Sequence, residues 1–154
     1  MTQKYKVILR AEDLNASALF ILFEMDRDHF PTPWSKEAWY KVFFSVGQRL
    51  LLIAEEDDVI LGFALFDITS ADSFAHLLKI VVGPNVRGVG IGKNLLSASI
   101  MVLKERNIKS FFLEVEEHNS HAINLYESLG FKIIHQKKQF YSSGTTALIM
   151  TLNV

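Results

Sequence analysis

Apolar residues along this chain recur with two different spacings, and the two spacings alternate from one end to the other. Apolar residues at every second position predict β-strands. They occur in "KYKVIL" (4–9), twice within "RLLLIAEEDDVILGFALFDI" (49–68) and in "AHLLKIVV" (75–82). An acidic turn at 56–58 separates the second and third of these strands, and Gly83 and Pro84 end the fourth. The last three are expected to form an antiparallel meander.

Apolar residues at every third or fourth position predict four α-helices. The helices are expected at 14–29, at 36–45, from a glycine-rich segment to about residue 106, and from Asn119 or Ser120 to 129. Ser35 is a candidate N-cap of the second helix, and Gly130 suits the left-handed position that ends the last. Further strands are expected at "SFFLEV" (110–115), "FKIIHQ" (131–136) and "TALIMTL" (146–152). This mixed α/β pattern fits one domain over residues 1–154.

Composition removes several classes of function. Sixteen Lys and Arg face 17 Asp and Glu, so the net charge of −1 provides no field for a polyanion, and we expect no nucleic-acid partner. The absence of cysteine excludes a cysteine nucleophile and thiolate metal sites. The longest apolar run, 59–66, is far below the roughly 18 residues of a membrane span, and the first residues lack a signal-peptide core. We therefore expect a cytoplasmic protein without a membrane partner.

The stretch "VRGVGIGKNLL" places Gly88, Gly90 and Gly92 between a strand and a helix. Unpaired amides of such a loop and of the first helical turn converge on one point, which predicts a phosphate or pyrophosphate site. The nucleoside-triphosphate loop does not fit because Asn94 follows Lys93, and the dinucleotide pattern fails in its glycine spacing. A tight turn without a ligand remains the alternative.

Two segments, "VVGPNVRGVGIGKNLL" and "FFLEVEEHNSHAINLYESLGF", resemble the GNAT superfamily of acetyl-coenzyme A-dependent N-acetyltransferases. The first is similar to that family's Arg/Gln-x-x-Gly-x-Gly/Ala signature, with Arg87, Gly90 and Gly92. Within the superfamily, "PWS" (33–35), "LEV" (113–115) and "NLYESLGF" (124–131) resemble the bacterial enzymes that acetylate the N-terminal alanine of a ribosomal protein. The resemblance implies the GNAT fold, a mixed, mostly antiparallel central sheet of six to seven strands flanked by about four helices.

The same resemblance implies roles for individual residues. Glu114 matches the general base and Tyr126 the general acid. Pro33, Trp34, Glu114 and Tyr141 are the expected acceptor residues, and no metal is expected. The residues implied in binding acetyl-CoA are Ile80, Val81 and Val82 along the pantetheine, Arg87, Gly88, Val89, Gly90, Ile91, Gly92 and Lys93 around the pyrophosphate, and Asn119 and Tyr126.

The residue types are suited to this chemistry. Alternation in "FFLEV" puts Glu114 and Phe112 on the face opposite Leu113, where a covered sheet would partly desolvate the carboxylate. A carboxylate can take the proton of an ammonium acceptor, and a phenol at Tyr126 can protonate the departing thiolate. An amide of Val81 or Val82 could stabilise the oxyanion if the strand splays there. The alternatives are a solvent-facing Glu114 and a Tyr126 that only packs in the core.

Without a cysteine to carry the acetyl group, we expect direct transfer in a ternary complex. The acceptor is expected to be a protein N-terminus, with a small amine such as a polyamine, amino acid or antibiotic as the alternative, and a non-catalytic CoA-binding module as a third hypothesis. Two features differ from the alanine acetyltransferases: Glu116 stands where they commonly have arginine, and "YSSGTTAL" lacks their acidic pair. His118 and His121 beside Glu117 are interpreted as a capped helix start. We expect a monomer or weak dimer.

Overall fold

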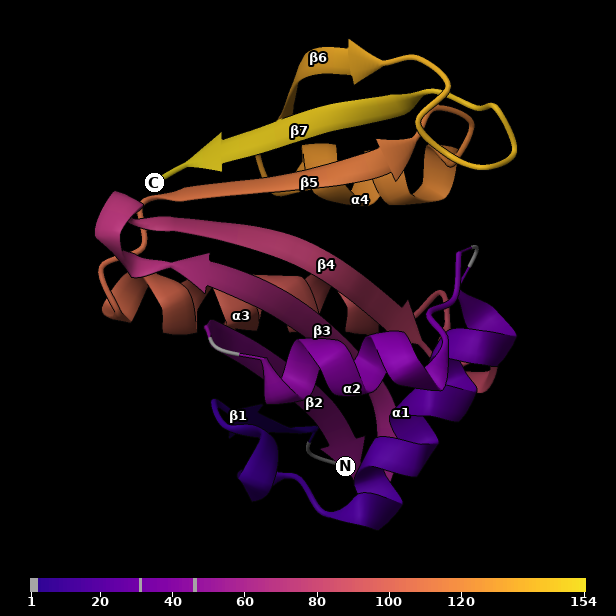
Figure 1. Ribbon diagram of the computed structural model, residues 1–154, viewed down its shortest axis with the longest axis vertical. Helices are drawn as coiled ribbons and strands as arrows, with labels where there is room; N and C mark the ends of the chain where they lie inside the picture. The colour runs from indigo at the N-terminus through magenta and orange to yellow at the C-terminus, as the bar shows by residue number, and fades with distance from the viewer. Residues whose placement is uncertain (1–2, 31, 46) are drawn as a thin grey trace.

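The computed structural model describes residues 3–30, 32–45 and 47–154, which form one seven-stranded sheet with helices on both faces (Figure 1). The strand order is β1-β2-β3-β4-β5-β7-β6, and every neighbouring pair is antiparallel except β4 and β5. The strands are β1 (Lys4–Ile8), β2 (Gln48–Glu56), β3 (Val59–Thr69), β4 (Phe74–Val82), β5 (Ser110–Glu116), β6 (Lys132–Lys137) and β7 (Ala147–Asn153). The expected mixed, mostly antiparallel sheet is therefore confirmed.

Four α-helices cover the two faces of the sheet. They are α1 (Ala16–His29), α2 (Lys36–Phe44), α3 (Ile91–Glu105) and α4 (Ser120–Ser128). Figure 1 shows α1 and α2 on the near face and α3 and α4 on the far face. The sequence pattern did not predict three short 3₁₀ helices, which lie in the connections from β1 to α1, from β3 to β4 and from β4 to α3. They are η1 (Ala11–Asp13), η2 (Ser70–Asp72) and η3 (Pro84–Val86). None of these helices, within the part of the chain that is described, is long and apolar enough to cross a bilayer.

The two faces of the sheet bury separate hydrophobic cores. The larger core joins the sheet to α3 and α4 and includes Leu95, Phe111 and Tyr126. The smaller core joins it to α1 and α2 and includes Leu22 and Trp39, which are almost completely buried. Strands with apolar residues on both faces, such as β3, are explained by this double burial.

The predicted helix ends are confirmed to within one residue, except at the start of the first helix. The Ser35 hydroxyl accepts from the amide of Ala38 at 3.1 Å, and Gly130 has the left-handed φ of 97° expected after α4. The first helix begins at Ala16 and not at residue 14, because the side chain of Asn15 caps it. Backbone amides in the first turn have no intrahelical partner, so this polar side chain fixes the start.

An irregularity in β4 shapes the centre of the sheet. Leu65 pairs with Lys79 and Phe66 with Leu77, so Leu78 is an extra residue in β4, a β-bulge. On its other side β4 pairs with β5 only from Phe74 to His76. Beyond this point the two strands separate, as Figure 1 shows, and their separated ends leave room for a ligand.

Candidate active site

The glycine-rich loop after β4 carries a row of unpaired amides. No backbone N–H from Gly88 to Lys93 donates a hydrogen bond to the described chain, and the first that does so in α3 is Asn94, to the Gly90 carbonyl at 3.0 Å. Gly88 and Gly90 have φ of 81° and 85°, a left-handed conformation that side chains disfavour. Two of the three glycines are thus explained by the backbone turn, which aims the amides at one place at the N-terminus of α3.

The edge of β4 that faces the gap also has peptide groups that are not paired with another strand. The Gly83 amide donates to Leu61 on β3 at 2.8 Å, and a Cβ atom at Gly62 would lie 2.7 Å from the Val81 carbonyl oxygen, which therefore also faces β3. Because peptide groups alternate along a strand, those of Val82 face the gap. The Val82 carbonyl accepts from Arg87 Nε at 3.0 Å. Of the two amides considered for the oxyanion, only that of Val82 points into the gap.

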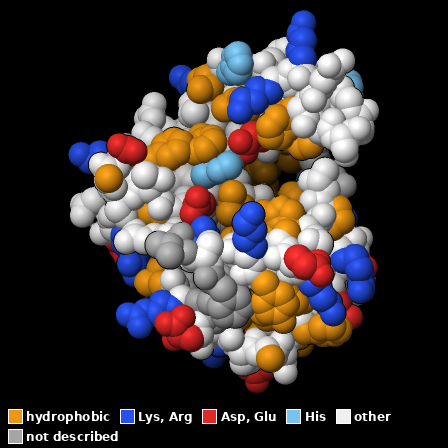
Figure 2. All heavy atoms as spheres, viewed as in Figure 1, with side chains coloured by type: hydrophobic (Ala, Val, Ile, Leu, Met, Phe, Trp, Pro, Cys, Tyr) orange, Lys and Arg blue, Asp and Glu red, His pale blue; other side chains and the backbone are white. Residues whose placement is uncertain are grey.

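A single cavity of about 840 Å³ connects the loop, the gap and the C-terminal end of α1. Figure 2 shows this face of the molecule hollowed, with hydrophobic side chains around the opening. The cavity brings together most of the residues predicted from the sequence: Ile80, Val81, Val82, Arg87, Gly88, Gly90, Ile91, Gly92, Lys93, Glu114, Asn119, Tyr126 and Tyr141.

Three predicted residues do not line this cavity. Val89 is 68% exposed, so its side chain points outward from the loop. Pro33 is exposed, and Trp34 packs its ring 4.4 Å from the Lys79 ammonium. The neighbouring Phe30 and Thr32 line the cavity in their place. A direct acceptor contact by Pro33 or Trp34 remains a prediction that the cavity lining does not support.

Glu114 lies where β4 and β5 separate. Its neighbours Leu113 and Val115 are buried in the far core, so its side chain is on the near face, as alternation predicted. The carboxylate is partly buried, with 19% of the side chain exposed, and its Oε2 is 2.6 Å from His76 Nε2. His76 was not predicted from the sequence, although it and Lys79 are the two polar residues of an otherwise apolar β4.

Tyr126 reaches the cavity from α4. It is 6% exposed, and burial raises the pKa of its phenol far above the usual range, with a smaller contribution from Tyr141. Burial, Glu114 and Glu116 together raise the pKa of Tyr141. Both phenols are therefore protonated at neutral pH, which is the form that a proton donor requires.

A buried ion pair at the wall of the cavity, which Lys79 lines, was also not predicted from the sequence. Lys79 Nζ is 2.8 Å from Asp26 Oδ1, and both side chains are at most 1% exposed. Asp26 Oδ2 accepts from the Trp34 amide at 2.9 Å and from Trp39 Nε1 at 2.7 Å. Burial lowers the pKa of Lys79, and Asp26 opposes this effect. Strict alternation would have turned Lys79 toward α3, but the extra residue at Leu78 turns it toward α1.

Glu116 is the other carboxylate at the cavity. Its Oε1 is buried and has no hydrogen-bond partner among the described residues, whereas Oε2 accepts from the His118 amide at 2.9 Å. Ligand atoms of Glu116, Glu117 and His118 come within 4.8 Å of one another. The His118 contact and the Asn119 cap of α4 account for this cluster as a helix start. That no metal binds here remains a prediction.

The fold and the cavity together can be compared with known proteins. The sequence profile of the "Acetyltransferase (GNAT) family" matches residues 19–131. The chain belongs to the GNAT family. The ribosomal protein bS18-alanine N-acetyltransferase of Haemophilus influenzae is 36% identical over 121 residues, which are 78% of this chain and 79% of that protein. The Salmonella typhimurium protein of the same name is 31% identical over 151 residues, 96% of this chain and 95% of that protein.

A solved GNAT structure agrees with this assignment. The ribosomal-protein-S18-alanine N-acetyltransferase from Escherichia coli superposes with a TM-score of 0.83 at 25% identity, covering 98% of this chain and 94% of the other. The predicted GNAT fold is therefore confirmed. As a member of this family with such relatives, the chain is an acetyl-CoA-dependent N-acetyltransferase.

Proposed function

We propose that this enzyme transfers the acetyl group of acetyl-CoA to the N-terminal amine of a ribosomal protein. One observation carries the proposal: a single cavity joins the unpaired amides after Gly88 to Glu114 and Tyr126. The names of the relatives from Haemophilus and Salmonella support the choice of acceptor. A ribosomal acceptor is also consistent with the predicted cytoplasmic location.

The donor is proposed to bind along β4. Its pyrophosphate would meet the amides from Gly88 to Lys93, where the helix dipole and two cations, Arg87 and Lys93, favour negative charge. Its pantetheine amides would pair with the edge of β4 that faces the gap, apart from the Val82 N–H, which is left for the thioester oxygen. The thioester would then lie in the gap between β4 and β5, near Glu114 and Tyr126.

The transfer itself needs one base and one acid. The acceptor ammonium gives a proton to Glu114, and its nitrogen forms a bond to the thioester carbon. The carbonyl oxygen becomes an oxyanion, for which the Val82 amide is the proposed donor. The C–S bond then breaks, Tyr126 protonates the thiolate, and the nitrogen loses its second proton to restore the phenol. The balance is one amide, one CoA thiol and one proton released to water.

The carboxylates favour a cationic acceptor. Glu114 and Glu116 both face the cavity, and Glu116 Oε1 lacks a donor. An ammonium group would satisfy this buried oxygen. A small diamine or amino acid is the second candidate acceptor, because Glu116 replaces the arginine common in alanine acetyltransferases. The two acceptor classes share the donor site and differ only at this end of the cavity.

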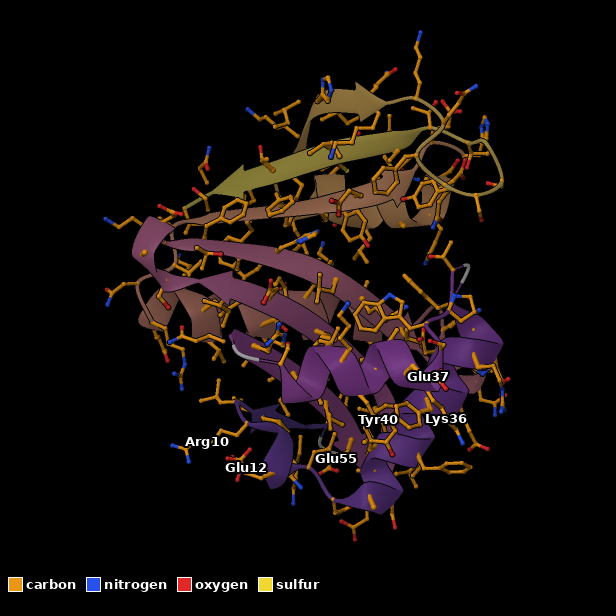
Figure 3. The ribbon with its side chains drawn as sticks, in the orientation of Figure 1. Arg10, Glu12, Lys36, Glu37, Tyr40 and Glu55 are labelled. Atoms are coloured by element: carbon orange, nitrogen blue, oxygen red, sulfur yellow. The ribbon has the colours of Figure 1, made fainter. Side chains whose placement is uncertain are left out.

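Release of CoA from acetyl-CoA tests the proposal, with an alanine-starting peptide of a ribosomal protein beside a panel of small amines. We expect turnover with the peptide and a loss of roughly 10²-fold or more in kcat for Glu114→Gln. Glu12→Gln is the matched control, since Figure 3 shows Glu12 after β1, away from the cavity, and its side chain is 70% exposed. Rapid turnover of small amines with none of the peptide would favour the second candidate. Full activity of Glu114→Gln would remove it as the base.

A further inference from the structure

His76 contacts Glu114, the candidate base, on the side away from the cavity. The pair His76–Phe112 is the last rung between β4 and β5, and Glu114 lies two residues further along, on the same face as His76. Glu114 lines the cavity, whereas His76 does not. The carboxylate thus has the acceptor space on one side and the imidazole on the other, at 2.6 Å.

The imidazole itself is fixed by aromatic stacking. Its ring lies 3.9 Å from the Phe112 ring at an interplanar angle of 14°, and Phe112 stacks on Phe74 at 4.3 Å and 16°. This row of three stacked rings holds the imidazole with Nε2 facing Glu114. The side chain of His76 is 26% exposed.

Acidic side chains from both neighbouring strands face His76. From β5 it faces Glu114, and from β3 it faces Asp67, its partner in the antiparallel register. Asp67 is 3.6 Å from Arg49 on β2. From β7, the residues paired with Phe112 and Glu114 are the uncharged Thr151 and Ile149.

We infer that His76 is the positioning residue of Glu114 and orients its carboxylate for acetyl transfer. This inference rests on the proposed role of Glu114 as the base. A neutral imidazole donates its Nε2–H to Oε2 and leaves Oε1 free for the proton of the acceptor. Without this donor the carboxylate can turn away from the acceptor, so transfer slows although the acetyl-CoA site is intact.

Two substitutions test this role. His76→Gln keeps an N–H donor for Glu114, and His76→Leu removes the donor. His76→Gln should keep a kcat near that of the wild type. His76→Leu should lose roughly tenfold in kcat, because a hydrogen bond to a charged group is removed, while the KM for acetyl-CoA stays unchanged.

His135→Gln is the matched control, because His135 is exposed on β6 and does not line the cavity. It should behave as the wild type does. An equal loss of kcat in His76→Gln and His76→Leu, or an unaltered kcat in His76→Leu, would overturn the inference. A wild-type enzyme that acetylates neither the peptide nor any small amine would instead contradict the proposed function, so the two failures are distinguishable. Thermal melting of each variant confirms that it folds.

Discussion

Tyr126 and Glu114 reach the same cavity from different surroundings. Tyr126 projects from a buried helix face and is 6% exposed, whereas the Glu114 side chain lies at the mouth of a splayed strand pair and is 19% exposed. Removal from water keeps the phenol protonated, and partial access to water lets the carboxylate exchange protons. Their environments are consistent with an acid and a base in one step.

Tyr126→Phe should slow turnover without unfolding the enzyme. The ring and its contact with Phe131, at 6.0 Å between centroids, are preserved, and the hydroxyl makes no hydrogen bond with any described residue. Loss of a proton donor typically costs 10²–10⁴-fold in rate, so we expect kcat to fall by about that factor while acetyl-CoA binding is retained. Steady-state rates and calorimetric titration with acetyl-CoA measure the two effects.

Tyr5→Phe is the control for this substitution, because Tyr5 lies on β1 and its hydroxyl makes only a weak contact with Gln3 at 3.4 Å. It should leave kcat unchanged. Equal activity of Tyr126→Phe and the wild type would assign Tyr126 to packing alone.

Glycine is required for different physical reasons at different positions around the N-terminus of α3. Gly90 has φ of 85° with open space around its Cα, so its constraint comes from the backbone. Gly92 is helical, and a Cβ atom there would lie 3.6 Å from Val82 Cγ2 and 3.7 Å from Leu125 Cδ2, at ordinary contact distance. Both of these neighbours line the cavity, so a methyl group at Gly92 would enter the ligand space.

Alanine substitutions should separate these two reasons. Gly90→Ala is expected to lower the free energy of unfolding by about 1–2 kcal/mol, because alanine is strained in the left-handed region. Gly92→Ala should leave stability unchanged or slightly raised, since alanine favours helix over glycine by up to about 1 kcal/mol. It should nevertheless weaken acetyl-CoA binding. Urea denaturation and calorimetry give both values, and unaltered binding by Gly92→Ala would place the pyrophosphate elsewhere.

The elements that local chemistry determines are the ones the sequence predicted. The side chains of Ser35 and Asn119 cap the N-termini of α2 and α4, and Gly130 follows the C-terminus of α4, all through contacts within a few residues. Apolar spacing located all seven strands. The bulge at Leu78 and the short pairing of β4 with β5 depend on partners distant in sequence. For that reason the Glu114 position was predictable, whereas its contact with His76 and the burial of Lys79 were not.

The Asp26–Lys79 pair links the near-face helices to β4, at the centre of the sheet. Asp26→Asn should destabilise the fold by about 3–5 kcal/mol, because Lys79 would be left as an uncompensated charge in a nearly dry site. Chemical denaturation measures the loss. Asp28→Asn, in an exposed pair with Arg27, is the control and should leave the free energy of unfolding close to that of the wild type. Similar small effects of both substitutions would mean that Lys79 finds another partner.

The separation of β4 from β5 has a mechanical consequence for the whole enzyme. In the described sheet, β4 and β5 pair at three positions, from Phe74 to His76, and this pairing links β1–β4 to β5–β7. A molecule bound in the gap contacts both groups of strands, so acetyl-CoA should stabilise their association. At about 100 times its Kd it should add about 2.7 kcal/mol of stability, seen as a higher melting temperature. Amide hydrogen exchange should slow on both sides of the gap together, since neither half can then open alone.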